Sequence, residues 1–427
     1  MKGLDKLKGK LKKALPRKTH QSSTVDKQPL GQPRILKPKA SSRTTSSTRS
    51  RTQFIIGLDF GTSYTKVAVS GFENKYTVQL LPNTHILPTR FFIDSVGNCT
   101  LEQSDAVDKI EVSKLKLIEN KARTRDLAIM AAYCALVLKS ARCWMLSKES
   151  RRLVNYEIDW LLNVGLPTES SQNSRLTTLY RKIIKSAWKF SNINDGFSLR
   201  ELESYLSFGD VPDKLSSHEF SDLHEDCLSL FPEFVGQIQS YIRSPQRQNF
   251  AHLLIDVGGG TVDVAVFRVV ENEGEYSYPI YGKSVRTIGA EVLNKKRESM
   301  GVKAADKWME GEFKALIGDV ITNIPSGSYV EDIHCIFIGG GASLPLYKKA
   351  LDDFKDKQKS YYPLRITGLN QPYEMVDTKL SERDFHRVSV AYGLTFEPDD
   401  LGFLELGVVE KKTSYKKSEN SYLLDAS

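Results

Sequence analysis

The stretch IDVGGGTVDVAV, residues 255–266, places three consecutive glycines between two runs of mostly apolar, β-branched residues. Such runs are typical of buried strands, but glycine weakens a strand interior because it costs backbone entropy and packs nothing. Three glycines together therefore indicate a turn that a ligand or another backbone approaches closely. We interpret the stretch as strand, glycine turn and strand, with Asp256 at the end of the first strand.

A second stretch, FIIGLDFGTSYTKVAVSGF at residues 54–72, follows the same plan, with Asp59 before its glycine turn. Two strand–Asp–Gly–Thr–strand units about 200 residues apart indicate a duplicated architecture, in which two lobes face each other across a cleft. Glycines let backbone N–H groups approach a polyphosphate, and Thr or Ser hydroxyls add donors. An aspartate at each strand end can hold Mg²⁺ through the waters of that ion.

A third stretch, HCIFIGGGASLPLYKKALDDF at residues 334–354, reads as an apolar strand, a triple-glycine turn, and a helix beginning near Ser343 or Pro345. A glycine turn that enters a helix N-terminus favours an anion or a flat ligand group laid against the backbone. Three such turns in one chain predict a nucleotide site.

These three stretches resemble the phosphate-1, phosphate-2 and adenosine motifs of the actin-like ATPase superfamily. Their residues resemble most closely those of the heat-shock-70 ATPase domain. The resemblance covers roughly residues 53–398 and extends to WLLNVGLPTES, SKLKLIEN, FPEFVGQIQSYI and VSVAYGLTF. It implies an α/β protein with a duplicated ribonuclease-H-like fold of two lobes and a nucleotide cleft. We expect lobe I at residues 53–248, lobe II at 249–398 and a C-terminal tail at 399–427.

The resemblance also implies ATP and Mg²⁺ as ligands and assigns residues to them. Asp59 and Asp256 would organise the water shell of the metal. The nucleotide-binding residues would be Gly61, Ser63, Tyr64, Gly258, Gly259 and Gly260 at the phosphates, and Gly339, Gly340, Gly341 and Ala342 at the adenosine.

Four residues receive a catalytic role from the same resemblance. Thr62 would help position the γ-phosphate, Thr261 would orient the attacking water, and Glu233 would be the carboxylate near that water. The chain reads Pro-Glu at residues 232 and 233 where the family reads Glu-Pro. Lys114 or Lys116 would neutralise charge on the γ-phosphate; the sequence does not choose between them, and Lys116 stands in our candidate set. Hydrolysis at such a site is mostly positioning and electrostatic stabilisation.

The N-terminal segment differs in composition from the rest of the chain. Residues 1–52 hold 15 Lys and Arg against Asp5 and Asp26, although the whole chain carries a net charge of only +8. Leu4, Leu7 and Leu11 recur at helical spacing, which is typical of a short basic amphipathic helix over residues 1–18 on an anionic membrane surface. A solvated basic arm, or an arm that contacts nucleic acid phosphates without reading sequence, is the alternative.

The cysteines and the hydropathy pattern bear on the compartment. The five cysteines are scattered without a CxxC pair, as in reduced cytosolic proteins. No apolar run reaches the roughly 18 residues of a spanning helix. We expect a cytoplasmic protein that can lie peripherally on a membrane.

Two function classes follow. The first is a slowly hydrolysing, heat-shock-70-like nucleotide switch whose cleft motion a partner protein reads, at residues 399–409, which resemble that family's interdomain linker. The second is a membrane-associated, filament-forming actin-like ATPase. It is favoured because only about 40 residues separate residue 291 from the strand at Ile333, whereas the heat-shock-70 family has a much longer segment there. An edge strand or a docking tail is the alternative for residues 399–409.

Overall fold

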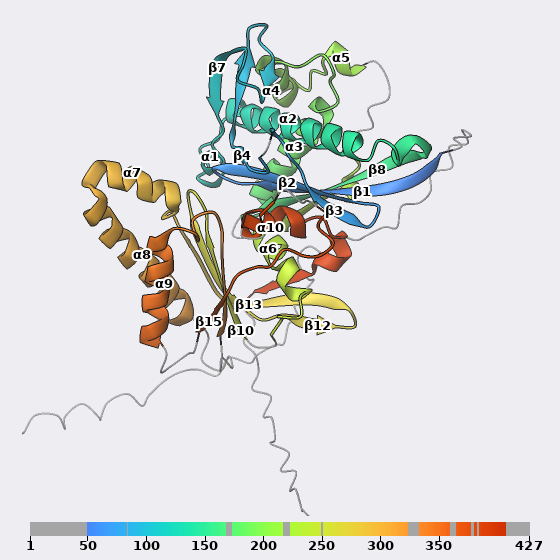
Figure 1. Cartoon of the computed structure of the whole chain (residues 1–427). Helices are drawn as coiled ribbons and strands as arrows, with labels where there is room; N and C mark the ends of the chain where they lie inside the picture. Colours follow the sequence, from blue (N-terminus) through green and yellow to red (C-terminus); the bar gives the residue numbers. More distant parts are fainter. Residues whose placement is uncertain are drawn as a thin grey trace, which may run out of the picture. The chain divides into compact units, whose positions relative to one another are not determined.

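The structure is a computed structural model that describes residues 49–82, 84–167, 173–216, 223–248, 251–322, 333–358, 364–376, 380–381 and 384–406 (Figure 1). The predicted amphipathic helix at residues 1–18 lies outside the described residues, as do residues 407–427.

The first lobe combines a large sheet, a small sheet and several helices. Its strands are β1 (Ser50–Phe60), β2 (Tyr64–Gly71), β3 (Asn74–Thr77), β4 (Leu87–Pro88), β5 (Arg90–Asp94), β6 (Cys99–Thr100), β7 (Ala106–Glu111), β8 (Tyr156–Leu166) and β9 (Leu228–Pro232). Its helices are α1 (Leu115–Ile118), α2 (Thr124–Lys148), α3 (Ser174–Phe190), α4 (Leu199–Phe208), α5 (Asp213–Ser216) and α6 (Glu233–Ile242), with short 3₁₀ turns at Leu153–Asn155 and Glu225–Cys227.

The second lobe follows at residue 251. Its strands are β10 (Ala251–Val257), β11 (Val262–Phe267), β12 (Val270–Asn272), β13 (Glu275–Arg286), β14 (Ile333–Ile338), β15 (Leu364–Thr367) and β16 (Phe403–Leu406). Its helices are α7 (Ala290–Met300), α8 (Val302–Thr322), α9 (Pro345–Gln358) and α10 (Phe385–Gly393), with a 3₁₀ turn at Pro398–Leu401.

The two large sheets repeat one topology. In lobe I the order is β3-β2-β1-β8-β9, with β1 antiparallel to β2 and parallel to β8. In lobe II the order β13-β11-β10-β14-β15 contains the same antiparallel meander followed by the same two parallel strands. This is the duplicated ribonuclease-H-like arrangement of the actin-like ATPase fold, so the predicted fold class is confirmed.

The strands that the motifs predicted form because they are buried on both sides. Successive residues, which point to opposite faces of a strand, are both buried: Phe54 and Ile55 of β1 are 0% and 4% exposed, and Leu253 and Leu254 of β10 are 0% and 3% exposed. A central strand covered by helices on both faces reads as a continuous apolar run rather than an alternating one. The two hairpins and the helix after the third glycine turn, which begins at Pro345, are therefore confirmed.

Two helices, α6 and α10, cross between the lobes at a pair of glycines. A Cβ on Gly393 would lie 1.9 Å from the carbonyl oxygen of Gly236, and a Cβ on Gly57 would lie 2.2 Å from that of Ala391. Only glycine permits these backbone approaches. The crossing brings the N-terminal end of α6 to the ends of β1 and β10, where the site is built.

Helix α2 is the one described helix whose length and composition would suit a membrane span, and 56% of its apolar window is buried. It packs against α3 and α4 in the core of lobe I. These contacts are those of a core helix.

The chain after α10 returns to lobe II. Strand β16 pairs in parallel with β13, so Phe403 lies beside Ser277. This part of the segment that we assigned to a tail at 399–427 is an edge strand of the lobe II sheet, and it does not have the form of a free interdomain linker. At the other end, β1 begins at Ser50, a few residues inside the segment that we assigned to the N-terminal tail.

Candidate functional site

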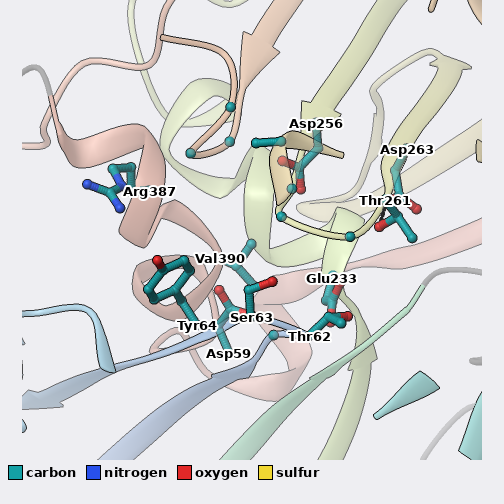
Figure 2. A pocket seen from close by; sticks show the side chains of 18 of the residues that line it. Asp59, Thr62, Ser63, Tyr64, Glu233, Asp256, Thr261, Asp263, Arg387 and Val390 are labelled. Carbon is teal, nitrogen blue, oxygen red and sulfur yellow. Dashed lines mark hydrogen bonds between the residues drawn. The ribbon is translucent and has the colours of Figure 1, made fainter. Parts of the chain in front are cut away.

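A cavity of about 510 Å³ lies between the turns of the two lobes (Figure 2). Nearly all the predicted residues line it: Asp59, Gly61, Thr62, Ser63, Tyr64, Glu233, Asp256, Gly258, Gly259, Gly260, Thr261, Gly339, Gly340 and Gly341. Ala342 and Lys116 are not among the lining residues. The duplicated fold therefore gathers turns from distant parts of the sequence around one cavity.

The glycines of this cavity hold the turns close together. A Cβ on Gly259 would lie 2.3 Å from Ser63 Oγ in the opposite lobe. Gly339 has a φ of +94°, and a Cβ there would lie 2.2 Å from Asp256 Oδ1. A larger residue at either position would displace the opposing turn or the aspartate.

Unsatisfied polar groups also point to an absent ligand. Ser63 Oγ is buried without a hydrogen-bond partner among the described residues. A buried hydroxyl without a partner costs roughly 1–3 kcal/mol, which a bound acceptor would recover. The phosphate oxygens of a nucleotide are acceptors of this kind.

The two hairpins present corresponding side chains to the cavity. The register of β1 and β2 sets Asp59 opposite Lys66, and these two form an ion pair of 2.9 Å. The register of β10 and β11 sets Asp256 opposite Asp263. The duplicated motif therefore carries a cation partner in lobe I and a second acid in lobe II.

The surroundings of the two acids of lobe II, Asp256 and Asp263, raise their pKa values. Burial raises the pKa of Asp256 to about 7, with the charges of Glu233 and Asp59 acting in the same direction. Burial, then the charges of Asp256 and Glu233, raise the pKa of Asp263 to about 8. Carboxyl groups held in this way gain from a nearby cation.

These residues fit Mg²⁺ held through water. Among the described residues no three His, Cys, Asp or Glu side chains converge closely enough to ligate a metal directly. Asp59 and Asp256 nevertheless face the same cavity from opposite lobes. Mg²⁺ usually keeps several waters and takes one or two carboxylates together with substrate phosphates.

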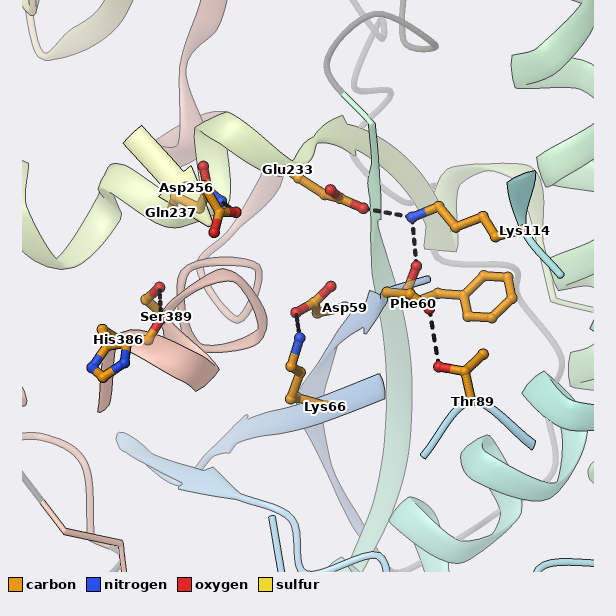
Figure 3. A network of polar contacts seen from close by, with 11 residues as sticks. Asp59, Phe60, Lys66, Thr89, Lys114, Glu233, Gln237, Asp256, His386 and Ser389 are labelled. Atoms are coloured by element: carbon orange, nitrogen blue, oxygen red, sulfur yellow. Dashed lines mark hydrogen bonds and ion pairs between the residues drawn. The ribbon is translucent and has the colours of Figure 1, made fainter. Parts of the chain in front are cut away.

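A buried ion pair joins Lys114 to Glu233 (Figure 3). Lys114 Nζ donates to Glu233 Oε1 at 2.7 Å and to the carbonyl oxygen of Phe60 at 2.5 Å, and the residue is 2% exposed. Burial alone would lower the pKa of Lys114, but the attraction of Glu233 outweighs it and raises the pKa. Lys114 is therefore a fixed positive charge at the cavity.

Our choice of Lys116 is corrected by this geometry. Its side chain is 51% exposed and pairs with Asp126 at 2.7 Å, at the start of α2. Helix α1 has only four residues and begins after Lys114, so the two lysines leave the backbone in different directions.

The reversed Pro-Glu order is compatible with the site. Pro232 is the N-cap of α6 and Glu233 its first residue, so the carboxylate projects from the helix N-terminus into the cavity. Proline suits a helix start because its missing N–H would have had no helical partner.

Several residues that line the cavity were not predicted from the sequence, among them Gln237, Asp263, Lys66 and Arg387. Gln237 lies one turn after Glu233 on α6 and donates to Asp256 Oδ2, and the i, i+4 spacing on a helix is a signal that could have found it. Asp263 lies two residues after Thr261, whose hydroxyl donates to it at 3.1 Å, and period-two spacing on a strand places both on one face. Lys66 and Arg387 carried no comparable signal.

Comparison with protein-family models and with curated proteins finds no match to the chain. Among solved structures, the chain is similar to apo ParM of pSK41, with 12% identity, 80% of this chain and 97% of that chain covered, and a TM-score of 0.39. It is similar to a non-polymerisable quadruple mutant of pCBH ParM, with 14% identity, 80% and 98% covered, and a TM-score of 0.40.

A third similar structure is MreB5 of Spiroplasma citri bound to ADP, with 12% identity, 80% and 94% covered, and a TM-score of 0.42. These comparisons do not support the particular similarity to the heat-shock-70 family that the motif residues suggested. Because all three TM-scores are low, the fold is assigned on strand order and register: the chain has the actin-like ATPase fold.

Proposed function

We propose that this chain binds Mg²⁺-ATP in the cavity between its lobes, hydrolyses it slowly, and couples hydrolysis to self-assembly into filaments. The observation that carries the proposal is the pair of hairpin turns that face each other across the cavity, with Asp59 and Asp256 at their strand ends. An acid and a glycine turn on each side suit a metal-bound polyphosphate gripped from both lobes.

Each group at the cavity has a part in this proposal. The backbone N–H groups of the three glycine turns and the Ser63 hydroxyl bind phosphate and nucleoside. Asp59 and Asp256 hold the waters of Mg²⁺, whose charge would stabilise the charge that develops on the phosphoryl group. Lys66 and Lys114 add fixed positive charge from lobe I.

Slow hydrolysis follows from the state of Glu233. Its carboxylate is paired with Lys114, so it is oriented towards the cavity and one of its oxygens is already occupied by a hydrogen bond from the ammonium group. It therefore acts by placing a water, together with Thr261, rather than by removing a proton early. Turnover well below the roughly 1–10³ s⁻¹ of metabolic enzymes is expected, because strong ground-state binding does not raise the rate.

Self-assembly is favoured over a heat-shock-70-like switch by the C-terminal chain. The segment that resembled an interdomain linker contains β16, which is paired into the lobe II sheet. The N-terminal amphipathic helix stays a sequence prediction for peripheral contact with an anionic membrane.

Pelleting of the purified full chain with ATP, ADP, GTP or no nucleotide, followed by electron microscopy of the pellets, tests this proposal. We expect filaments with Mg²⁺-ATP and none for Asp256→Ala. A chain that binds and hydrolyses ATP but stays monomeric at every concentration would act as a switch. Filaments that form equally without nucleotide would contradict control by the cavity.

A further inference from the structure

The two ends of lobe II carry opposite charge, and each end exposes apolar side chains. The first end, the basic tip, is the turn between α7 and α8 and comprises Lys295, Lys296, Met300, Val302, Lys303 and Lys307. The second, the acidic end, comprises Glu273 and Glu275 of the β12–β13 hairpin, Asp399 and Asp400 of the 3₁₀ turn, and Phe403 of β16.

At the basic tip, apolar side chains protrude among lysines. Met300 is 46% exposed and Val302 is 61% exposed. Lys295, Lys303 and Lys307 are exposed and form no ion pair with the described residues, whereas Arg297 is already neutralised by Asp306 at 2.7 Å. Glu298 is the exposed acid of this segment, so the tip combines exposed apolar surface with a net positive charge, which favours a partner that is both apolar and acidic.

The acidic end matches this description. Glu273 and Glu275 are exposed and have no ion pair among the described residues, whereas Glu271 pairs with Arg247 at 2.9 Å. A Cβ on Gly402 would lie 2.5 Å from the carbonyl oxygen of Tyr276, so the 3₁₀ turn lies against the start of β13. Phe403, beside it, is 46% exposed and supplies the apolar component.

The two surfaces lie at opposite ends of one lobe (Figure 1). Helix α8 runs along β13: Gly282 packs against Val320, and Arg286 pairs with Glu312 nearer the start of the helix. Val302 therefore lies about 27 Å from Val320 in the direction in which β13 ends. Glu275 lies about 23 Å from Gly282 in the opposite direction.

We propose that the basic tip of one copy of this chain docks on the acidic end of a second copy. The contact joins different surfaces at opposite ends of a lobe, so its repetition extends head to tail instead of closing a dimer. The inference rests on the proposed self-assembly and names the surfaces that carry it. Charge pairing sets the register, and the apolar side chains at the centre supply the desolvated contact.

Reciprocal charge reversal tests this contact. The tip variant is Lys303→Glu with Lys307→Glu, and the end variant is Glu273→Lys with Glu275→Lys; the matched control, Lys348→Glu with Lys349→Glu, lies on exposed positions of α9. Sedimentation velocity at low and high salt measures self-association of the full chain. We expect each of the two test variants to associate at least tenfold more weakly than the wild type, and the control to associate like the wild type. The wild type itself should associate more weakly at high salt.

An equimolar mixture of the two test variants supplies the decisive arm, because the reversed, acidic tip of one variant then meets the reversed, basic end of the other, and the unreversed tip meets the unreversed end. We expect the mixture to recover wild-type association. Variants that associate like the wild type, or a mixture that stays monomeric, would overturn the contact. Loss of binding to phosphatidylserine vesicles by the tip variant with unchanged self-association would also overturn it, because the tip would then be a lipid surface.

Calorimetric ATP titration of the same variants separates this inference from the proposed function. Both surfaces lie outside the cavity, so ATP affinity is expected to stay within twofold of the wild type. Absence of ATP binding in the wild type would count against the proposed function, whereas the charge-reversal arms, compared with the wild type under conditions in which the wild type self-associates, still decide the contact.

Discussion

Lys114 holds a positive charge at a place where burial opposes it. The ion pair with Glu233 and the hydrogen bond to the Phe60 carbonyl keep the ammonium protonated beside the glycine turns of the cavity. Such a preorganised charge stabilises developing negative charge without reorganisation during the reaction. Lys116, two residues later, is half exposed and pairs with Asp126 instead.

Lys114→Met should therefore reduce the single-turnover rate of ATP hydrolysis by roughly 10²-fold, because a fixed charge near the transferring phosphoryl group is removed. Lys116→Met is the matched control and should hydrolyse ATP at the wild-type rate. Quench-flow measurement with Mg²⁺-ATP compares the two. Equal loss in both variants would mean that the lysines act on folding, which circular dichroism would reveal.

Glu233→Gln tests the carboxylate itself. Glutamine keeps the size and an oxygen that accepts from Lys114, but it lacks the charge that orients water, so hydrolysis should slow by roughly 10²-fold. ATP affinity measured by calorimetry should change little, and Glu225→Gln, on the surface, should change neither quantity. Wild-type hydrolysis by Glu233→Gln would leave Thr261 as the group that positions water.

The residues of the cavity were predictable from sequence only where a motif carried them. Asp59, Asp256 and the glycines stand in turns whose spacing indicates phosphate binding. The choice between Lys114 and Lys116 depends on the direction of the backbone before a four-residue helix, which no periodicity encodes. Asp263 receives no role from any motif, although it lies on the same strand face as Thr261, whose hydroxyl donates to it.

At the scale of elements, strand register determines the surroundings, and so the pKa, of the buried side chain of His252. Strands β10 and β14 place His252 beside His334, and Tyr241 lies against both rings. Burial, then the neighbouring His334, lower the pKa of His252 to about 3. The folded state therefore keeps this histidine neutral at pH values where an unfolded chain would protonate it.

Stability should consequently fall as the pH drops from about 6.5 towards 3, because the unfolded chain takes up the proton first. For His252 this amounts to roughly 3 kcal/mol between pH 6.5 and pH 4. His252→Gln should flatten that part of the pH dependence, whereas His224→Gln, at an exposed position, should not. Urea denaturation at both pH values measures the difference, and an unchanged slope for His252→Gln would contradict the neutral buried ring.

The strands and helices themselves were easier to predict from sequence than the way in which helices pack across one another. The hairpins around Asp59 and Asp256 and the start of α9 follow from apolar runs and glycine turns. The crossing of α6 and α10 depends on Gly236 and Gly393, which stand about 150 residues apart in the chain and belong to no turn. Nothing in the local pattern of either helix indicates that the two glycines meet, since that contact is set by tertiary packing.

At the scale of the whole molecule, the duplication explains the site. Each lobe supplies a hairpin turn, an acid at a strand end and a flanking helix, and the cavity lies where the two sets face each other. Neither lobe alone surrounds the cavity. The duplicated plan was visible in the sequence as two related motifs, whereas the opposed charges at the ends of lobe II appear only once α8 is laid along β13.

Isothermal titration calorimetry of the full chain with ATP, in the presence and absence of Mg²⁺, tests the central claim most directly. We predict binding by the wild type that weakens at least tenfold when Mg²⁺ is chelated, and loss of this metal dependence in Asp256→Ala with an unchanged circular dichroism spectrum. Absence of Mg²⁺-dependent ATP binding by the wild type, or equal metal dependence in Asp256→Ala, would contradict the account.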